Sequence, residues 1–154
     1  MGFLKSGDVI NGREGTAFMT IDGRNIPMFF LKNIEATVEL TKTEVPVLGK
    51  RMTQQKVTGA AGSGSMTIHK VTSEFAKIGI SYLKSGKIPD ITIKITNDDP
   101  QSTVGRQSTL IKNVLFDSII IAKLDVESET LDEDVDFTFD DADLLEAFTD
   151  PKLG

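Results

Sequence analysis

Apolar and polar residues alternate most clearly in the segment from residue 34 to residue 41. One face of this segment would carry Ile34, Ala36, Val38 and Leu40, and the other would carry Glu35, Thr37, Glu39 and Thr41. This period of two is typical of a half-buried β-strand. Beyond Leu40 the apolar face ends, because Lys42, Glu44 and Pro46 take its positions. We therefore expect the first part of the strand to belong to the protein's own core and the chain to leave that core at Leu40.

The strand pattern is too long for one compact sheet. Fifteen residues from Ile34 to Leu48 would span roughly 50 Å if extended, whereas a usual strand has about 5 to 6 residues. A return strand is expected from about Gln54 to Val71, across the glycine-rich stretch Gly59–Gly64. A two-stranded ribbon is marginally stable alone, and its open edges pair readily with other chains. The pattern thus predicts a hairpin arm that contacts a partner.

Shorter patterns predict the other elements. Residues 15–21 and a strand from about Asn25 should form a hairpin around the turn Asp22-Gly23. A helix is expected from Glu74 to Ser85, capped by Thr72 or Ser73 and ended by Gly86. Its apolar residues recur at helical spacing and are Phe75, Ile78, Tyr82 and Leu83.

Four further strands are expected at residues 88–96, 110–116, 118–126 and 134–140, with a loop at 97–108. The last has Val135, Phe137 and Phe139 facing inward and its acids facing outward. Seven or eight strands and one helix predict a mainly β fold, a β-sandwich or barrel, in a single domain over residues 1–154.

Composition narrows the class of protein. The chain has no cysteine, which excludes disulfides, thiolate metal sites and cysteine nucleophiles. No run approaches the roughly 20 apolar residues of a membrane span, so we expect no stable membrane association. The start Met-Gly-Phe-Leu-Lys lacks the apolar region of a signal peptide. We expect the chain to be made in the cytoplasm.

The net charge of −6 hides a division along the chain. Residues 1–124 contain 16 Lys and Arg against 11 Asp and Glu, whereas residues 125–154 contain one Lys against 12 acids. Two interpretations remain open. The acidic C-terminal segment is either a solvated tail, or a surface that repels an anion or meets a basic neighbour.

Candidate chemical motifs are weak. The stretch Gly59–Gly64 lacks the Lys-Ser/Thr ending of a phosphate-binding loop, so a flexible strand or bend is favoured. Acids at alternate positions of the last strand resemble a calcium loop, but Phe137 stands at the required glycine and Asp143 at the required glutamate. We expect these acids to point outward, where a weakly held ion at a subunit boundary is the alternative. The acids in question, with one more in the same segment, are Asp132, Asp134, Asp136 and Asp140.

Catalysis is not indicated by the sequence. His69 is the only histidine, and a structural or surface role is favoured for it. We predict no catalytic, cofactor-binding or metal-binding residues and no enzyme. The basic residues Lys50 and Arg51, with Lys42 and Lys56 nearby, have no interleaved aromatic residues for base stacking, so a protein contact is favoured over nucleic acid.

The order and spacing of short segments over residues 10–141 resemble the tail tube proteins of contractile phage tails, above all those of Gram-positive prophages and phage-tail-like bacteriocins. The matching segments are Asn11-Gly-Arg-Glu-Gly15, Glu44-Val-Pro-Val-Leu-Gly-Lys-Arg-Met-Thr53, Lys56, Thr58-Gly-Ala60, Gly62, Gly64, Lys70-Val-Thr-Ser73, Phe116-Asp-Ser118, Leu124-Asp-Val-Glu-Ser-Glu129 and Phe137-Thr-Phe-Asp-Asp141.

The resemblance implies a tail-tube fold whose copies form hexameric rings that stack into a hollow tube inside a contractile sheath. Implied partners are other copies of the chain, the sheath, the baseplate, the tail terminator and DNA in transit, in a particle assembled in the bacterial host cytoplasm. The hairpin at about 40–58 would reach the next ring. Its implied contact residues are Lys42, Glu44, Val45, Val47, Leu48, Lys50, Arg51, Met52 and Lys56, and the acids Asp132, Asp134, Asp136 and Asp140 would face the lumen or the sheath.

The sequence disfavours two alternative functions. A ligand- or carbohydrate-binding β-sandwich module would present an aromatic platform, but the chain has one Tyr and no Trp. A small hydrolase using two carboxylates would need inward-facing acids on neighbouring strands, whereas the patterned acids are expected to face outward.

Overall fold

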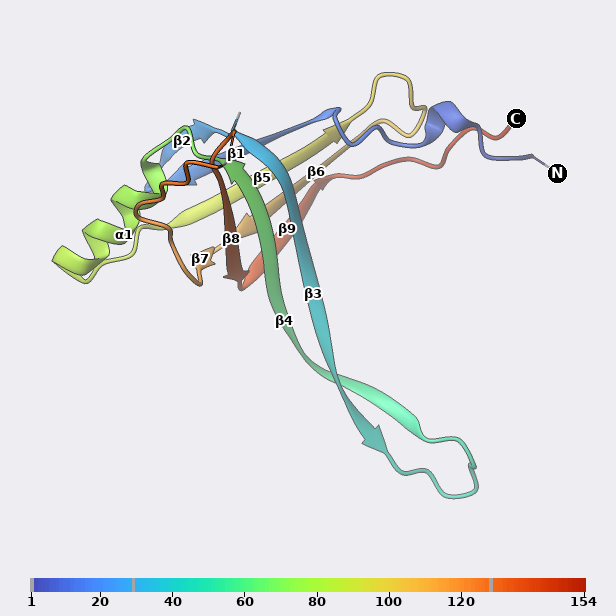
Figure 1. The fold of residues 1–154 in the computed structure, drawn as a ribbon. Coiled ribbons are helices and arrows are strands. Elements are labelled where there is room, and N and C mark those ends of the chain that lie inside the picture. Colours follow the sequence, from blue (N-terminus) through green and yellow to red (C-terminus); the bar gives the residue numbers. More distant parts are fainter. Residues whose placement is uncertain (1, 29, 128) are drawn as a thin grey trace.

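The computed structural model describes residues 2–28, 30–127 and 129–154. In this part of the chain, nine strands form two antiparallel sheets, and one α-helix lies at one end of them (Figure 1). One sheet has the strand order β2-β1-β5-β6-β9 and the other the order β3-β4-β8-β7. The fold class predicted from the sequence, mainly β with one helix and a protruding hairpin, is confirmed.

The five-stranded sheet consists of β1 (Gly15–Ile21), β2 (Arg24–Pro27), β5 (Ile91–Asp98), β6 (Arg106–Lys112) and β9 (Asp141–Glu146). The four-stranded sheet consists of β3 (Leu31–Val45), β4 (Gln54–His69), β7 (Leu115–Phe116) and β8 (Asp132–Phe139). A short 3-10 helix, η1, spans Ser6–Asp8. Asp22 and Gly23 join β1 to β2 with positive φ at both positions, as a tight hairpin turn requires.

The core lies between the sheets. Met19 and Ile93 of the first sheet face Met66 and Phe137 of the second, and each of these side chains is at most 1% exposed. Three aromatic rings complete the core at the helical end. The rings of Phe30 and Phe75 meet edge to face at 6.1 Å between centroids, and Phe75 meets Phe116 at 5.3 Å.

Helix α1 spans Glu74–Ser85. The Thr72 hydroxyl accepts a hydrogen bond from the Glu74 amide at 3.3 Å, and Gly86, in the left-handed conformation, ends the helix. The first half of the helix packs on the core through Phe75 and Ile78. Tyr82 and Leu83 continue the same apolar stripe but are exposed. In the described part of the chain, no helix is long and apolar enough to cross a membrane.

Several predicted strands are wrong in position. Residues 118–126 form no strand, because Ile119 packs over Gly79 of α1 and draws the chain out of the sheet after the two-residue β7. Strand β5 starts only at Ile91, after Pro89, which has no amide hydrogen to donate. Strand β6 begins inside the predicted loop at 97–108, and β9 was not predicted.

Glycines of β4 make room for aromatic rings of β8. Gly64 pairs with Phe137 and Gly62 with Phe139 in the β4–β8 ladder. A Cβ on Gly62 would lie 2.5 Å from the Phe139 ring, and one on Gly64 would meet the Phe137 ring and lie 2.5 Å from the Glu35 carbonyl oxygen. The two glycines therefore allow close packing between β4 and β8, which the predicted flexible strand or bend did not include.

We expect Gly64→Ala to lower the free energy of unfolding by about 1–3 kcal/mol, because the added methyl group overpacks a site closed by backbone on one side. Urea unfolding followed by circular dichroism measures the change. Gly59→Ala is the matched control, since its nearest neighbour would be Thr41 Cβ at 3.8 Å. Equal stability of the two variants would contradict the packing role of Gly64.

The most deeply buried acid of the described residues was not predicted. Glu133 of β8 is 1% exposed and forms an ion pair with Lys70, whose Nζ lies 2.5 Å from Oε1. The sequence pattern could have predicted this burial. Val135, Phe137 and Phe139 face inward at every second position, and Glu133 is the preceding position of the same face. Its partner Lys70 follows directly after β4.

Lys70→Met should lower the free energy of unfolding by about 3–5 kcal/mol, because it leaves a buried carboxylate without its partner. Lys32→Met removes the cation beside Asp132, whose side chain is 32% exposed, and should cost about 1 kcal/mol or less. Chemical denaturation of both variants gives the comparison. A Lys70→Met protein as stable as the Lys32→Met protein would show that the buried pair contributes little.

Candidate assembly surfaces

Strands β3 and β4 extend beyond the sheet as a two-stranded arm. They stay paired as far as Val45 and Gln54, whereas β8 pairs with β4 only as far as Gly62. The ribbon beyond this point projects away from both sheets (Figure 1). We call residues 39–61 the arm. The structure places all nine predicted contact residues on it, and all nine are exposed.

The arm changes its regular pairing close to the predicted exit at Leu40. Thr41 pairs with Gly59 but Lys42 pairs with Val57, so Thr58 is an extra residue in β4 and forms a β-bulge. The Thr58 hydroxyl lies 3.2 Å from the Thr43 hydroxyl across the strands. Bulges bend a strand and increase its twist, and here the bulge falls where the ribbon leaves the domain.

The apolar face of β3 is uncovered from Ala36 to Leu40, where the arm begins. Val38 and Leu40 are 52% and 58% exposed, and Ala36 is exposed as well. The prediction that these three residues lie in the protein's own core is therefore wrong. No strand in the described part of the chain covers them, and β8, in the same sheet, ends at Phe139, beside Gly62. An exposed apolar strip on a strand is typical of a surface that meets another protein.

The tip of the arm combines apolar and cationic side chains. Gly49, with φ of 84°, turns the chain, and the Lys50 amide hydrogen-bonds to the Val47 carbonyl at 3.4 Å. Leu48 and Met52 are exposed on the tip, next to Lys50 and Arg51. Such a tip can insert apolar groups into a partner while its cations contact an acidic rim.

Acids and small hydroxyl side chains predominate in the central rows of the outer face of the four-stranded sheet, where Asn33 and the exposed Leu115 lie at the two edges. In the ladders Glu35 pairs with Ser65 and Ser65 with Asp136, and the neighbouring rows repeat this pattern. We call this surface the polar face. It consists of Glu35, Thr37, Glu39, Ser63, Ser65, Thr67, Asp134, Asp136 and Thr138, four carboxylates and no Lys or Arg.

The four predicted surface acids have different surroundings. Asp134 and Asp136 lie on the polar face, where Asp134 accepts a hydrogen bond from the Thr67 hydroxyl at 2.8 Å. Asp132 lies at the margin of this face, between Lys32 Nζ at 3.1 Å and His69 Nδ1 at 3.0 Å. The hydrogen bond from Lys32 holds the pKa of Asp132 below its usual value, with His69 acting in the same direction. Asp140 accepts from the Asn113 amide at 2.6 Å.

The acidic C-terminal segment is not a solvated tail between residues 132 and 146, because these residues form β8 and β9. The acids of β9 meet cations of β6. Lys112 Nζ lies 2.6 Å from Asp143, a hydrogen bond that raises the pKa of Lys112, and Arg106 pairs with Glu146 at 3.1 Å. Part of the charge division along the sequence is thus neutralised by the fold.

No group of three or more His, Cys, Asp or Glu among the described residues is arranged to hold a metal ion. Asp8 is buried, but its Oδ1 accepts from the Thr103 amide and hydroxyl at 2.7 Å, so it ties the N-terminal segment to the loop between β5 and β6. The hydrogen bond from the Thr103 hydroxyl lowers the pKa of Asp8. These hydrogen bonds indicate a structural role for Asp8.

Two relatives from Bacillus subtilis (strain 168) match nearly the whole chain. The phage-like element PBSX protein XkdM is 44% identical over 147 residues, which cover 96% of this chain and 97% of XkdM. The uncharacterized protein YqbM is 45% identical, over 93% of this chain and 95% of YqbM.

Solved structures agree with the fold. A Bacillus subtilis protein structure is 37% identical with a TM-score of 0.53, over 88% of this chain and 99% of that one. Chains in the anti-feeding prophage cap and in the sheath-tube complex of an extracellular contractile injection system have TM-scores of 0.66 and 0.59. The match to the cap chain covers 90% of this chain and 91% of that one, at 12% identity. The match to the sheath-tube chain covers 85% of this chain and 88% of that one, at 11% identity.

The family model described as "Phage tail tube protein" matches residues 2–146. Together with the similarity to XkdM of the phage-like element PBSX, this match confirms the resemblance found in the order of short sequence segments. The chain belongs to the phage tail tube protein family.

Proposed function

We propose that this chain is the repeating subunit of the inner tube of a contractile tail, in which hexameric rings stack through the arm. The observation that carries the proposal is the arm itself. Its two strands are long, exposed on every residue and paired only with each other beyond Gly62. A ribbon of this kind is stabilised when it lies on another subunit, since an isolated hairpin is marginal in water.

Lateral association would use the edges of the four-stranded sheet. Strand β3 is one edge of this sheet and β7 is the other. A contact between the β3 side of one copy and the β7 side of the next is heterologous, and repeated contacts of this type close into a ring when the rotation allows it. The exposed residues Val38 and Leu40 of β3 would be covered in such an arrangement.

The polar face would line the lumen of the tube. Its four carboxylates and its small hydroxyl groups offer no cation to phosphate, and binding of DNA depends on cationic contacts. DNA could therefore pass without being held. The same wall would suit a tube that only punctures a target envelope.

The role proposed here is structural, without catalysis or a cofactor. The subunit would assemble in the cytoplasm of a bacterial host, where the sheath surrounds the tube and the baseplate and the terminator bind its two ends. Chains of the same fold occur in structures of the anti-feeding prophage baseplate and cap and of the sheath-tube complex of an extracellular contractile injection system, which supports these partners.

Removal of the arm should abolish stacking but not folding. Replacement of Lys42–Thr58 by Asn-Gly joins the paired residues Thr41 and Gly59 through a two-residue hairpin turn. We expect a folded protein with an unchanged core, present as rings or monomers, and no tubes by negative-stain microscopy. Light scattering over a concentration series gives the particle size. Long tubes from this variant would contradict the proposed role of the arm.

The position of the polar face can be tested by thiol labelling, because the chain has no cysteine of its own. A thiol at Ser65→Cys should react with a small maleimide in free protein and in tubes. It should react with a maleimide on a bulky polymer only in free protein, since a lumen excludes the polymer. Lys84→Cys on α1 is the control and should react with both reagents. Full reaction of Ser65→Cys tubes with the bulky reagent would place the polar face elsewhere.

A further inference from the structure

We propose that the loop between β7 and β8 of one copy inserts Leu124 and Val126 into the groove between the two sheets of the neighbouring copy. This inference rests on the proposed ring and names the lateral contact that builds it. The partner is a second copy of this chain.

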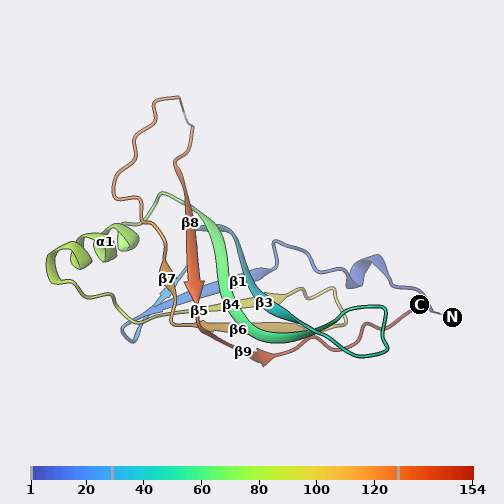
Figure 2. The same cartoon turned by 90° about the horizontal axis from the view of Figure 1, so that it is seen from below.

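The loop projects from the body and exposes apolar side chains. Residues 117–131 connect β7 to β8, and the segment rises away from both sheets (Figure 2). Leu124 is 89% exposed and Val126 is 92% exposed, although both are apolar. Loops of about 12–15 residues or more without secondary structure are usually functional or disordered.

The loop is anchored at its base and free at its apolar end. Ile119 packs over Gly79 of α1, and Lys123 Nζ donates a hydrogen bond to the Asp132 carbonyl at 2.6 Å. The Asp125 carboxylate accepts from the Glu127 amide at 3.1 Å, which forms a turn around Val126. These contacts hold the two apolar side chains outward on an ordered base, which lowers the entropic cost of binding.

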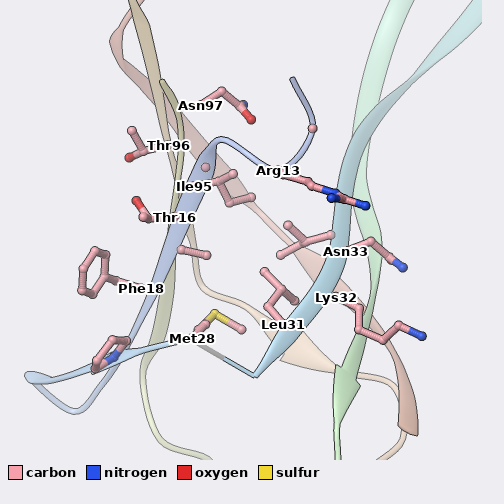
Figure 3. A pocket seen from close by; sticks show the side chains of 15 residues that line it. Arg13, Thr16, Phe18, Met28, Leu31, Lys32, Asn33, Ile95, Thr96 and Asn97 are labelled. Carbon is pink, nitrogen blue, oxygen red and sulfur yellow. The ribbon is translucent and has the colours of Figure 1, made fainter. Parts of the chain in front are cut away.

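The groove lies between the sheets, where β1 and β5 diverge from β3 (Figure 3). It is open to solvent and has a volume of about 650 Å³. Ala17 and Met28 form part of its buried floor, and the half-buried Leu31, Ile34 and Ile95 line it above them. Figure 3 shows Met28, Leu31 and Ile95 between the strands, so the groove is an open margin of the core.

The charges at the two surfaces are complementary. Arg13 reaches across the groove toward β3 in Figure 3, and it has no ion pair with any described residue. The loop carries the exposed acids Asp125, Glu127 and Glu129 beside its apolar residues. An apolar centre with an ion pair at its rim is the usual composition of a specific protein contact.

The positions of the two surfaces fit a ring. The loop follows β7 at one edge of the four-stranded sheet, and the groove adjoins β3 at the other edge. The two halves of the contact therefore adjoin opposite edge strands of one sheet, although Lys32 of the groove and Lys123 of the loop both contact Asp132. This is the arrangement of a heterologous, head-to-tail interface that can close on itself.

Cross-linking tests the contact directly. The double variant Val126→Cys/Leu31→Cys, assembled and treated with a short bis-maleimide, should give a ladder of covalent oligomers in a denaturing gel. The reagent avoids the strict geometry of a disulfide. Each single variant alone should stay monomeric in the gel. A mixture of the two single variants should stop at dimers, because each copy then has only one reactive half.

A charge inserted into the contact gives a second readout. Leu124→Asp/Val126→Asp should raise the protein concentration needed for assembly by about tenfold or more, because an unpaired carboxylate is excluded from an apolar groove. Thermal unfolding should be unchanged, since both side chains are exposed. Val71→Asp is the control, at an apolar residue that is 65% exposed outside the loop and the groove. It should assemble like the unchanged protein.

The outcomes separate this inference from the proposed function. Tubes of the unchanged protein together with no ladder, or with normal assembly of Leu124→Asp/Val126→Asp, would overturn the loop contact alone. The same holds if Val71→Asp weakens assembly equally. An unchanged protein that remains monomeric at every concentration would overturn the tube and the loop contact together.

Discussion

The pairing of β4 with its neighbouring strands connects the arm to the core. From Gly62 to His69 this strand lies between β3 and β8, and from Gln54 to Ala61 it has only β3 as a neighbour. One strand thus belongs to the core and to the arm. Because an isolated two-stranded ribbon is marginal in water, the position of the arm depends on how firmly its inner end is held. The close contact of Gly62 and Gly64 with the rings of Phe139 and Phe137 supplies that hold.

Charge imposes a second constraint on assembly. In the proposed tube, several copies would present the polar face to a shared lumen and bring many carboxylates together. The screening length at physiological ionic strength is about 8 Å, so neighbouring carboxylates would still repel one another. Acids elsewhere do not add to this repulsion as strongly, because Asp143 and Glu146 of β9 are paired with Lys112 and Arg106. The remaining repulsion must be offset by apolar lateral contacts, such as a groove lined by Leu31, Ile34 and Ile95 can provide.

Period-two alternation in the sequence predicted β3 and β8 well, and the glycine after the helix marked its end. The same reasoning failed at residues 118–126, where a strongly β-forming sequence leaves the sheet because Ile119 packs on α1. It also missed β9, whose acids resembled a solvated segment until their partners on β6 were known. In both segments, contacts with residues distant in the sequence determine the structure, and the local pattern of residues cannot predict such contacts.

Some segments have the apolar pattern of buried strands but are exposed in a single copy of the chain. The alternation from Ile34 to Leu40 requires a covered apolar face, yet Val38 and Leu40 are exposed. The segment 118–126 likewise has the composition of a buried strand, yet it exposes Leu124 and Val126. An apolar pattern that the isolated fold leaves exposed is most simply explained by burial against another chain. In the proposed tube, the sequence of one subunit encodes apolar contacts between copies as well as its own core. The apolar residues that one copy leaves exposed belong to the first group.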